Sequence, residues 1–211
     1  MSQTIGQDNS PAMLEQAGGH AGGGLGFRTA DISRFGTEPE DAGRYDLVFS
    51  NAALHWVGGD HAAVLAQWAT ALKAGGQLAV QVPANVDHPS HTTSAELAHE
   101  EPFLSALGAA VPPDPVSSVL RPEQYAEALH AIGFADQHVR LQVYGHVLES
   151  AADVVTWVSG TSLTRFRSRL AGDTYDEFVK RYTRRLVERL GDRRPYFYAF
   201  KRILLWAKLP D

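Results

Sequence analysis

The chain has 211 residues, of which 44% are hydrophobic and 20% charged, values that are ordinary for a globular protein with a well-buried core. No apolar run approaches membrane-spanning length, and the N-terminal residues MSQTIGQDNS are too polar for a secretory leader, so we expect no membrane partner. The net charge of −5 argues against a nucleic-acid partner. The absence of cysteine excludes disulfides and thiol chemistry and suits a cytoplasmic location.

The N-terminal segment alternates between short predicted elements. Residues 4–6 resemble the end of a strand, and Ser10 before Pro11 is typical of a helix start. The glycine-rich residues 18–26 do not have the spacing of a dinucleotide-binding loop, so we interpret them as a flexible connection. Residues 26–32 predict a second strand that ends near Asp31.

The most informative segment is residues 45–91. It predicts a buried strand at 45–49, a helix capped by Asp60, a left-handed turn at Gly75 and Gly76 that stops this helix, and a second buried strand at 77–82. A strand, a helix and a strand in this order predict a right-handed βαβ unit. The polar residues Ser50 and Asn51 end the first strand, where a parallel sheet opens onto a ligand crevice.

The C-terminal half predicts further helices and two more strands. We predict helices at 94–107, 122–132, 151–161 and 174–190, with strands at 135–148 and 196–209. Arginine is frequent between residues 165 and 194, which indicates either a site for an anionic partner or a solvated helix face with Glu177 and Arg181 paired one turn apart. His88 and His91 invite a metal interpretation, but Pro89 predicts a loop there and no fourth ligand is apparent, so we predict no metal site.

Several segments together resemble the class I S-adenosylmethionine-dependent methyltransferases, and most closely the trans-aconitate 2-methyltransferase family. The segments are QDNSPAMLEQA, ADI at 30–32, YDLVFSNAALHWV, LKAGGQLAVQVPANVDHPSH, VVTWVSGTSL and YAFKRILLWA. The resemblance implies S-adenosylmethionine as the cofactor and a small carboxylic acid as the substrate. It does not indicate the oligomeric state.

The resemblance implies a set of cofactor-binding residues. Asp8 would accept hydrogen bonds from the ribose hydroxyls, with Asn9 against the adenine. Asp31 would accept from the adenine amino group, and Ile32 would add a backbone contact. Asn51 and Ala52 would border the methionine part. Helix capping and turn formation are the alternative roles of Asp8 and Asp31, but their place at the ends of consecutive strands favours the cofactor site.

The resemblance also implies residues for the acceptor. His55 and Trp56 would form the wall between methyl donor and acceptor, and a polycarboxylate would require cationic and hydroxyl donors. The substrate-binding candidates are His55, Trp56, His91, Arg121, Arg165, Tyr196 and Arg202. An acceptor carboxylate is already anionic at neutral pH, so no general base is required and no catalytic residue is assigned.

One family feature is missing. The family opens with a strand, a glycine-rich loop and a helix, and this sequence begins at roughly the second strand. We therefore predict an α/β Rossmann-like doubly wound sheet that is N-terminally truncated, in a single domain of residues 1–211 with a helical insertion at 151–194 before the last strand. Three functions stay open: a methyltransferase for a small polycarboxylic acid, a catalytically impaired remnant that acts as an interaction module, and a methyltransferase for a different acceptor such as an acyl-carrier thioester or a secondary metabolite.

Overall fold

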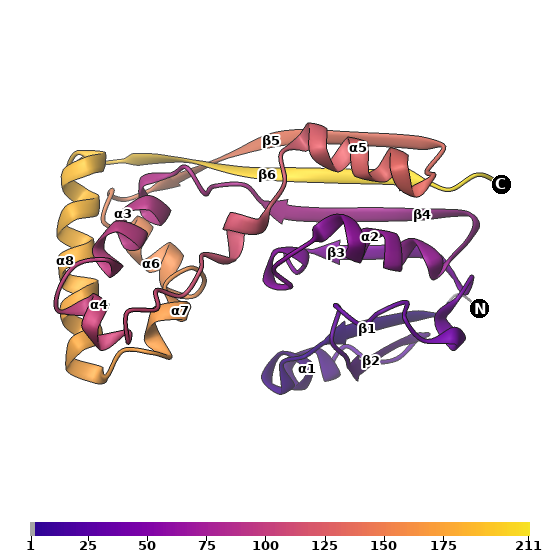
Figure 1. Cartoon of the computed structure of the whole chain (residues 1–211), viewed down its shortest axis with the longest axis horizontal. Coiled ribbons are helices and arrows are strands. Elements are labelled where there is room, and N and C mark those ends of the chain that lie inside the picture. Colours follow the sequence, from indigo (N-terminus) through magenta and orange to yellow (C-terminus); the bar gives the residue numbers. More distant parts are fainter. Residues whose placement is uncertain (1–2) are drawn as a thin grey trace. The chain divides into compact units, whose positions relative to one another are not determined.

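The computed structural model describes residues 3–211, which cluster into two compact units (Figure 1). Unit 1 contains the chain up to Val82, the segment Leu120–Arg140 and the C-terminal segment Leu204–Asp211. Unit 2 contains Pro83–Val119 and Leu141–Ile203. No helix among residues 3–211 is long and apolar enough to cross a membrane.

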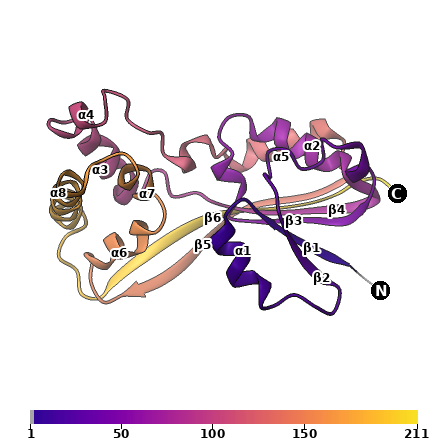
Figure 2. The same ribbon diagram turned by 90° about the horizontal axis from the view of Figure 1, so that it is seen from below.

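The N-terminal elements of unit 1 are β1 (Thr4–Asp8), α1 (Pro11–Gly18) and β2 (Leu25–Thr29). The two strands pair in parallel, with Asp8 opposite Thr29 (Figure 2). The helix begins where the sequence predicts, because the Ser10 side chain accepts a hydrogen bond from the backbone N–H of Met13 and Pro11 occupies the first turn. Among residues 3–211, β1 and β2 form a sheet of their own.

The predicted βαβ unit is present as β3 (Tyr45–Asn51), α2 (His61–Thr70) and β4 (Leu72–Pro83), which follow the short helix η1 (Pro39–Asp41). The strands are parallel, and the Asp60 side chain caps α2 by accepting from the N–H groups of Ala62 and Ala63. The buried Trp68 of α2 donates from its indole N–H to the carbonyl of Ile32 at 3.0 Å. This bond attaches the segment that follows β2 to the helix.

A four-stranded sheet has the order β3-β4-β6-β5, with β5 at Asp136–Leu148 and β6 at Tyr196–Lys208. The N–H of Ala84 donates to the carbonyl of Lys201, and that of Leu209 to Gly76, so β6 runs antiparallel to β4. A closing antiparallel strand after a run of helices agrees with the fold predicted from the sequence.

The helix α5 (Pro122–Ile132) also belongs to unit 1, and it starts and ends as predicted. Pro122 opens it, and Gly133 ends it in the left-handed conformation with φ of 103°. Its buried Tyr125 hydroxyl lies 2.6 Å from Nδ1 of the equally buried His61 on α2. This contact joins the two helices of the unit through a polar pair.

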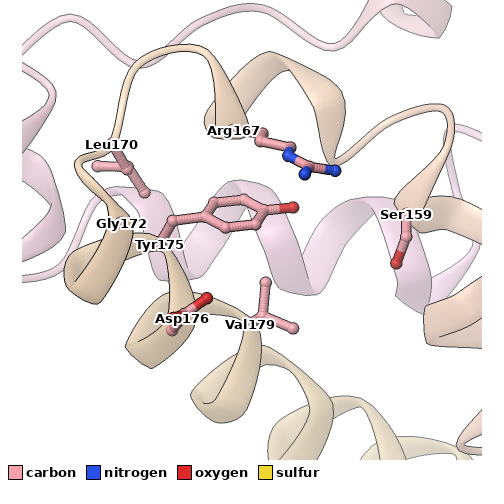
Figure 3. Close-up of a pocket in the computed structure, with 7 residues that line it drawn as sticks. All are labelled: Ser159, Arg167, Leu170, Gly172, Tyr175, Asp176 and Val179. Carbon is pink, nitrogen blue, oxygen red and sulfur yellow. The ribbon is translucent and has the colours of Figure 1, made fainter.

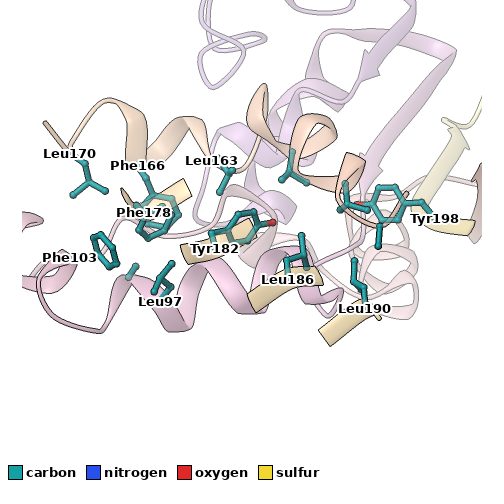
Figure 4. Close-up of a cluster of buried hydrophobic side chains, with 14 of the residues drawn as sticks. Leu97, Phe103, Leu163, Phe166, Leu170, Phe178, Tyr182, Leu186, Leu190 and Tyr198 are labelled. Atoms are coloured by element: carbon teal, nitrogen blue, oxygen red, sulfur yellow. The ribbon is translucent and has the colours of Figure 1, made fainter. Parts of the chain in front are cut away.

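Unit 2 is built around one apolar cluster of helical side chains and two tyrosines of β6 (Figure 4). Its helices are α3 (Pro89–Ala98), α4 (Phe103–Ala106), η3 (Pro115–Ser118), α6 (Asp153–Ser159), α7 (Thr164–Arg167) and α8 (Gly172–Leu190). The predicted stripe of α8 supplies Phe178, Tyr182, Leu186 and Leu190 to this core. Burial of large side chains is the dominant stabilising contribution here.

The arginines of α8 are engaged with nearby glutamates. Arg181 donates to Glu177 at 2.7 Å one turn away, as the solvated-face interpretation predicts, and Arg185 forms a bidentate pair with Glu100 after α3. Arg189 contacts Glu96 of α3 in the same way. These half-exposed pairs give little net stability, but those of Arg185 and Arg189 connect α8 with α3 and the residues just after it.

Three local predictions were wrong. The single helix predicted at 94–107 is two helices, because α3 already begins at Pro89 and ends at Ala98 before α4. Pro89 marks the first turn of a helix and not a loop, since the His88 side chain accepts from the N–H of Ser90 as its cap. Gly75 does not stop α2, which ends at Thr70; with φ of 67° it lies in β4, where the pairing with β3 shifts register.

Candidate functional site

The two acidic residues assigned to the cofactor follow neighbouring parallel strands of unit 1. Asp8 is the last residue of β1, and Asp31 comes two residues after the end of β2. Because parallel strands present their carboxyl ends at the same sheet edge, the two residues share one edge of the β1–β2 pair. This is the arrangement that the sequence predicts for a nucleoside site.

Both carboxylates also make local turn contacts. Asp8 Oδ1 accepts from the N–H of Ser10 at 2.8 Å, and Asp31 Oδ1 accepts from the N–H and hydroxyl of Ser33 at 2.9 and 2.7 Å. The Ser33 hydrogen bonds lower the pKa of the exposed Asp31 carboxyl, so it is ionised at neutral pH. Each of these contacts uses Oδ1, which leaves the second oxygen of each group able to accept a further hydrogen bond.

The end of β3 carries the next group of predicted residues. Asn51 is exposed, and Ala52 has φ of 51°, a left-handed conformation that costs free energy for a residue other than glycine. The N–H of Ala52 donates to the carbonyl of Gln81 on β4 at 2.9 Å, which holds this strained turn. Strain of this kind is concentrated at functional sites.

The short helix η2 (Leu54–Trp56) follows at once. Its His55 side chain is buried, whereas Trp56 is 52% exposed, with the two ring centroids 5.1 Å apart. An indole this exposed beside the end of a parallel strand is available to contact a ligand.

Two of the predicted acceptor-binding residues, both in unit 2, contact the same carboxylate, that of Asp114, which sequence reasoning missed. Asp114 Oδ2 lies 2.9 Å from Nδ1 of His91 on α3 and 2.8 Å from Nη1 of Arg165 on α7. All three side chains are at least nine-tenths buried. Asp114 Oδ1 accepts from the N–H of Val116 and caps η3. A buried charge is retained only when it is paired in this manner.

A second polar group of unit 2 contains Tyr196, another predicted acceptor residue. Its hydroxyl lies 3.2 Å from Nε2 of His88, whose Nδ1 accepts from the N–H of Ser90. Burial, with a smaller contribution from the nearby His91, lowers the pKa of His88 to about 4, so the ring is neutral at pH 7 and its Nε2–H donates to Tyr196. Tyr196 therefore anchors the start of α3.

The remaining two arginine candidates have other surroundings. Arg121 belongs to unit 1, is exposed, and pairs with Glu123 at 2.5 Å at the start of α5. Arg202 of β6 lies over the rings of Tyr144 and Phe200, with its guanidinium carbon 5.9 and 4.8 Å from their centroids. The structure therefore brings together His91 and Arg165, and it gives Arg121 and Arg202 separate partners.

A surface pocket of about 560 Å³ lies among α6, α7 and α8 (Figure 3). Arg167 and the half-buried Tyr175 line it, together with Ser159, Leu170 and Asp176. None of the residues assigned from the sequence is among those that line it.

The residues that were missed share one property. Asp114 lies 23 residues after His91 and 51 before Arg165, so no local spacing connects it with them. The only signal in the sequence is an aspartate immediately before Pro115, which is typical of a helix cap. Asn85 is likewise fully buried and bound to Lys201, 116 residues away.

Comparison with known proteins adds to this geometry. A family model described as "Methyltransferase domain" matches residues 1–80. A trans-aconitate 2-methyltransferase from Deinococcus radiodurans is 39% identical over 210 residues, which are 98% of this chain and 78% of that protein. One from Streptomyces avermitilis is 37% identical over 98% of this chain and 76% of that protein.

The chain belongs to the trans-aconitate 2-methyltransferase family. As a member of this family it is an S-adenosylmethionine-dependent methyltransferase, as the sequence predicts.

Solved structures confirm the Rossmann-like fold. The YcgJ protein from Bacillus subtilis matches with a TM-score of 0.56 at 14% identity, over 99% of this chain and 83% of that one. Haemonchus contortus phosphoethanolamine N-methyltransferase 2, solved with S-adenosyl-L-methionine, matches with a TM-score of 0.52 at 17% identity, over 99% and 44%.

Proposed function

We propose that this chain transfers a methyl group from S-adenosylmethionine to a carboxylate of trans-aconitate or a closely similar polycarboxylic acid. The names of the relatives in two organisms support the acceptor class. The observation that carries the cofactor part is the pair Asp8, at the end of β1, and Asp31, two residues after the end of the adjacent parallel strand β2.

The residues at this strand edge fit the adenosine part of the cofactor. Asp8 retains an oxygen that can accept from the ribose diol, with Asn9 beside the adenine. Asp31 would accept from the adenine amino group, and Ile32 would add a backbone contact whose position is fixed by Trp68. The strained Ala52 and its neighbour Asn51 would border the methionine part.

The chemistry that we propose needs alignment more than acid–base catalysis. S-adenosylmethionine supplies an electrophilic methyl group on a sulfonium sulfur. Because an acceptor carboxylate is ionised at neutral pH, it attacks without a general base, and the residues of this chain have to orient it and exclude water. From the resemblance we propose His55 and Trp56 for the wall beside the acceptor. His91 and Arg165, which share Asp114 in unit 2, are the best-supported candidates for contacting its carboxylates, whereas Arg121, Tyr196 and Arg202 have other partners.

The test is methyl transfer by the purified 211-residue chain. With labelled S-adenosylmethionine and trans-aconitate, cis-aconitate and citrate offered separately, we expect a labelled monomethyl ester with trans-aconitate as the preferred acceptor. Mass spectrometry of the product identifies the esterified carboxylate. No ester with any of the acids, from protein that is folded by circular dichroism, would refute the proposal.

One observation favours the second candidate function, a non-catalytic interaction module. Within residues 3–211, β3 is an edge strand of the four-stranded sheet, and its Leu47 and Phe49 are 53% and 69% exposed. An open strand edge with exposed apolar side chains is a surface for pairing with another chain. Detection of the methyl ester in the methyl-transfer assay would refute the interaction-module alternative.

A further inference from the structure

The carboxylate of Asp114 holds two side chains that come from different helices of unit 2. One oxygen, Oδ2, contacts both Nδ1 of His91 and Nη1 of Arg165, at 2.9 and 2.8 Å. The other, Oδ1, is held by the backbone N–H of Val116 at 3.1 Å. Prolines at 112, 113 and 115 restrict the backbone around it. Asp114 is therefore fixed independently of the two residues that it contacts.

The charge state of Asp114 determines the state of the histidine. Burial alone would raise the pKa of Asp114, but the hydrogen bond from His91 and the charge of Arg165 lower it overall. An ionised carboxylate can only accept hydrogen bonds, so Nδ1 of His91 carries a proton. The other nitrogen, Nε2, is then the ring atom left for a ligand, and the orientation of the ring is fixed.

One N–H donor of Arg165 has no partner among the residues that the structure describes. Its Nη1 donates to Asp114 and its Nη2 to the hydroxyl of Ser94 at 3.1 Å. Its Nε is buried and, among the residues that the structure describes, has no hydrogen-bond partner. A buried donor without a partner is costly, and a carboxylate oxygen is the acceptor that best matches a guanidinium N–H.

We propose that Asp114 is a positioning residue of the acceptor site, which orients Arg165 so that its Nε–H donates to one carboxylate group of the acid, with the His91 ring held beside it. This inference rests on the proposed function for the identity of the acid. Asp114 also cancels one positive charge, so the site recognises the carboxylate by directed hydrogen bonds and not by excess charge.

Steady-state kinetics of three variants test the positioning role. Asp114→Asn removes the ionised acceptor, and Arg165→Lys keeps the charge but removes the Nε–H. Asp153→Asn is the matched control, because Asp153 is the first residue of the short helix α6 of unit 2 and also accepts from a backbone N–H and a hydroxyl, those of Ser150. For the first two variants we expect the KM for trans-aconitate to rise about tenfold or more, the size of one lost charge-assisted hydrogen bond. The KM for S-adenosylmethionine should stay at the wild-type value.

Stability and spectroscopy separate positioning from mere structural support. Thermal unfolding midpoints should fall in both Asp114→Asn and Asp153→Asn, and further in Asp114→Asn, which leaves the buried Arg165 without its charged partner. The KM for the acceptor should rise in Asp114→Asn alone. Nitrogen-15 NMR of the imidazole should report Nδ1–H at His91 in the wild type and its loss in Asp114→Asn. A wild-type KM in Asp114→Asn or in Arg165→Lys, or an equal rise in Asp153→Asn, would overturn the inference.

A binding measurement without cofactor distinguishes failure of this inference from failure of the proposed function. Titration of the wild type with trans-aconitate alone should shift the NMR signal of Arg165 Nε–H, and no shift would overturn the inference. A shift of the Arg165 Nε–H signal without any methylation would refute the proposed function but still support the carboxylate site. Methylation with unchanged kinetics in Asp114→Asn would refute the inference alone.

Discussion

The substitution Asn85→Ala tests how the segment after β4 is held to β6. Asn85 is fully buried, its Oδ1 accepts from the backbone N–H of Lys201 at 2.6 Å, and its Nδ2 donates to the Tyr198 hydroxyl at 3.3 Å. Alanine leaves the Lys201 N–H without its acceptor, and an unsatisfied buried group costs about 1–3 kcal/mol. The longer bond to Tyr198 contributes less, because that hydroxyl also interacts with Ser90. We therefore expect the free energy of unfolding to fall by about 2–3 kcal/mol.

Urea denaturation followed by circular dichroism measures this loss, read as a lower midpoint at an unchanged slope. Tyr198→Phe is the matched control, since it removes only the longer hydrogen bond and should cost about 1 kcal/mol or less. A loss below about 1 kcal/mol in Asn85→Ala, or a loss no larger than that of Tyr198→Phe, would show that Asn85 does not hold the two segments together.

Two further predictions concern stability. Burial lowers the pKa of His88 from 6.5 to about 4, so the unfolded chain binds more protons between these values and the free energy of unfolding falls as the pH drops through that window. The full shift corresponds to about 3 kcal/mol of unfolding free energy, and because solvent screens the half-buried ring we expect a loss of about 2 kcal/mol. Urea midpoints measured across this pH range should therefore depend less on pH in His88→Gln than in the wild type. An equal pH dependence in both proteins would contradict this prediction. Leu186→Ala in the core of unit 2 should cost about 3 kcal/mol in the same assay, with exposed Glu188→Ala near zero, and a loss below about 1 kcal/mol would count against the packing described.

Local signals predicted the elements that carry the candidate cofactor site. Ser10 and Asp60 cap the helices that they were expected to cap, and Gly133 ends α5 in a left-handed turn. These devices act over three or four residues, so they are visible in the sequence. The positions of Asp8 and Asp31 at strand ends follow from the same kind of local pattern.

Long-range partners could not be predicted in the same way. Asp114 meets Arg165 only after α7 is packed in unit 2, and Asn85 meets β6 across more than a hundred residues of sequence. The start of α3 was missed for a local reason, because histidine is an uncommon cap and Pro89 was interpreted as a loop residue. The contacts of Asp114 in the candidate acceptor site therefore depend on tertiary packing, which local sequence patterns do not reveal.

Calorimetric titration of the purified chain with S-adenosylhomocysteine tests the cofactor assignment most directly. We predict micromolar binding by the wild type, weakened about tenfold or more in both Asp8→Ala and Asp31→Ala, each of which removes a charged acceptor from the nucleoside site. Asp46→Ala, at an exposed aspartate of β3 that pairs with Lys73, should bind like the wild type. No binding up to high micromolar concentration, or equal binding by all four proteins, would contradict the assignment of the β1–β2 edge to the cofactor.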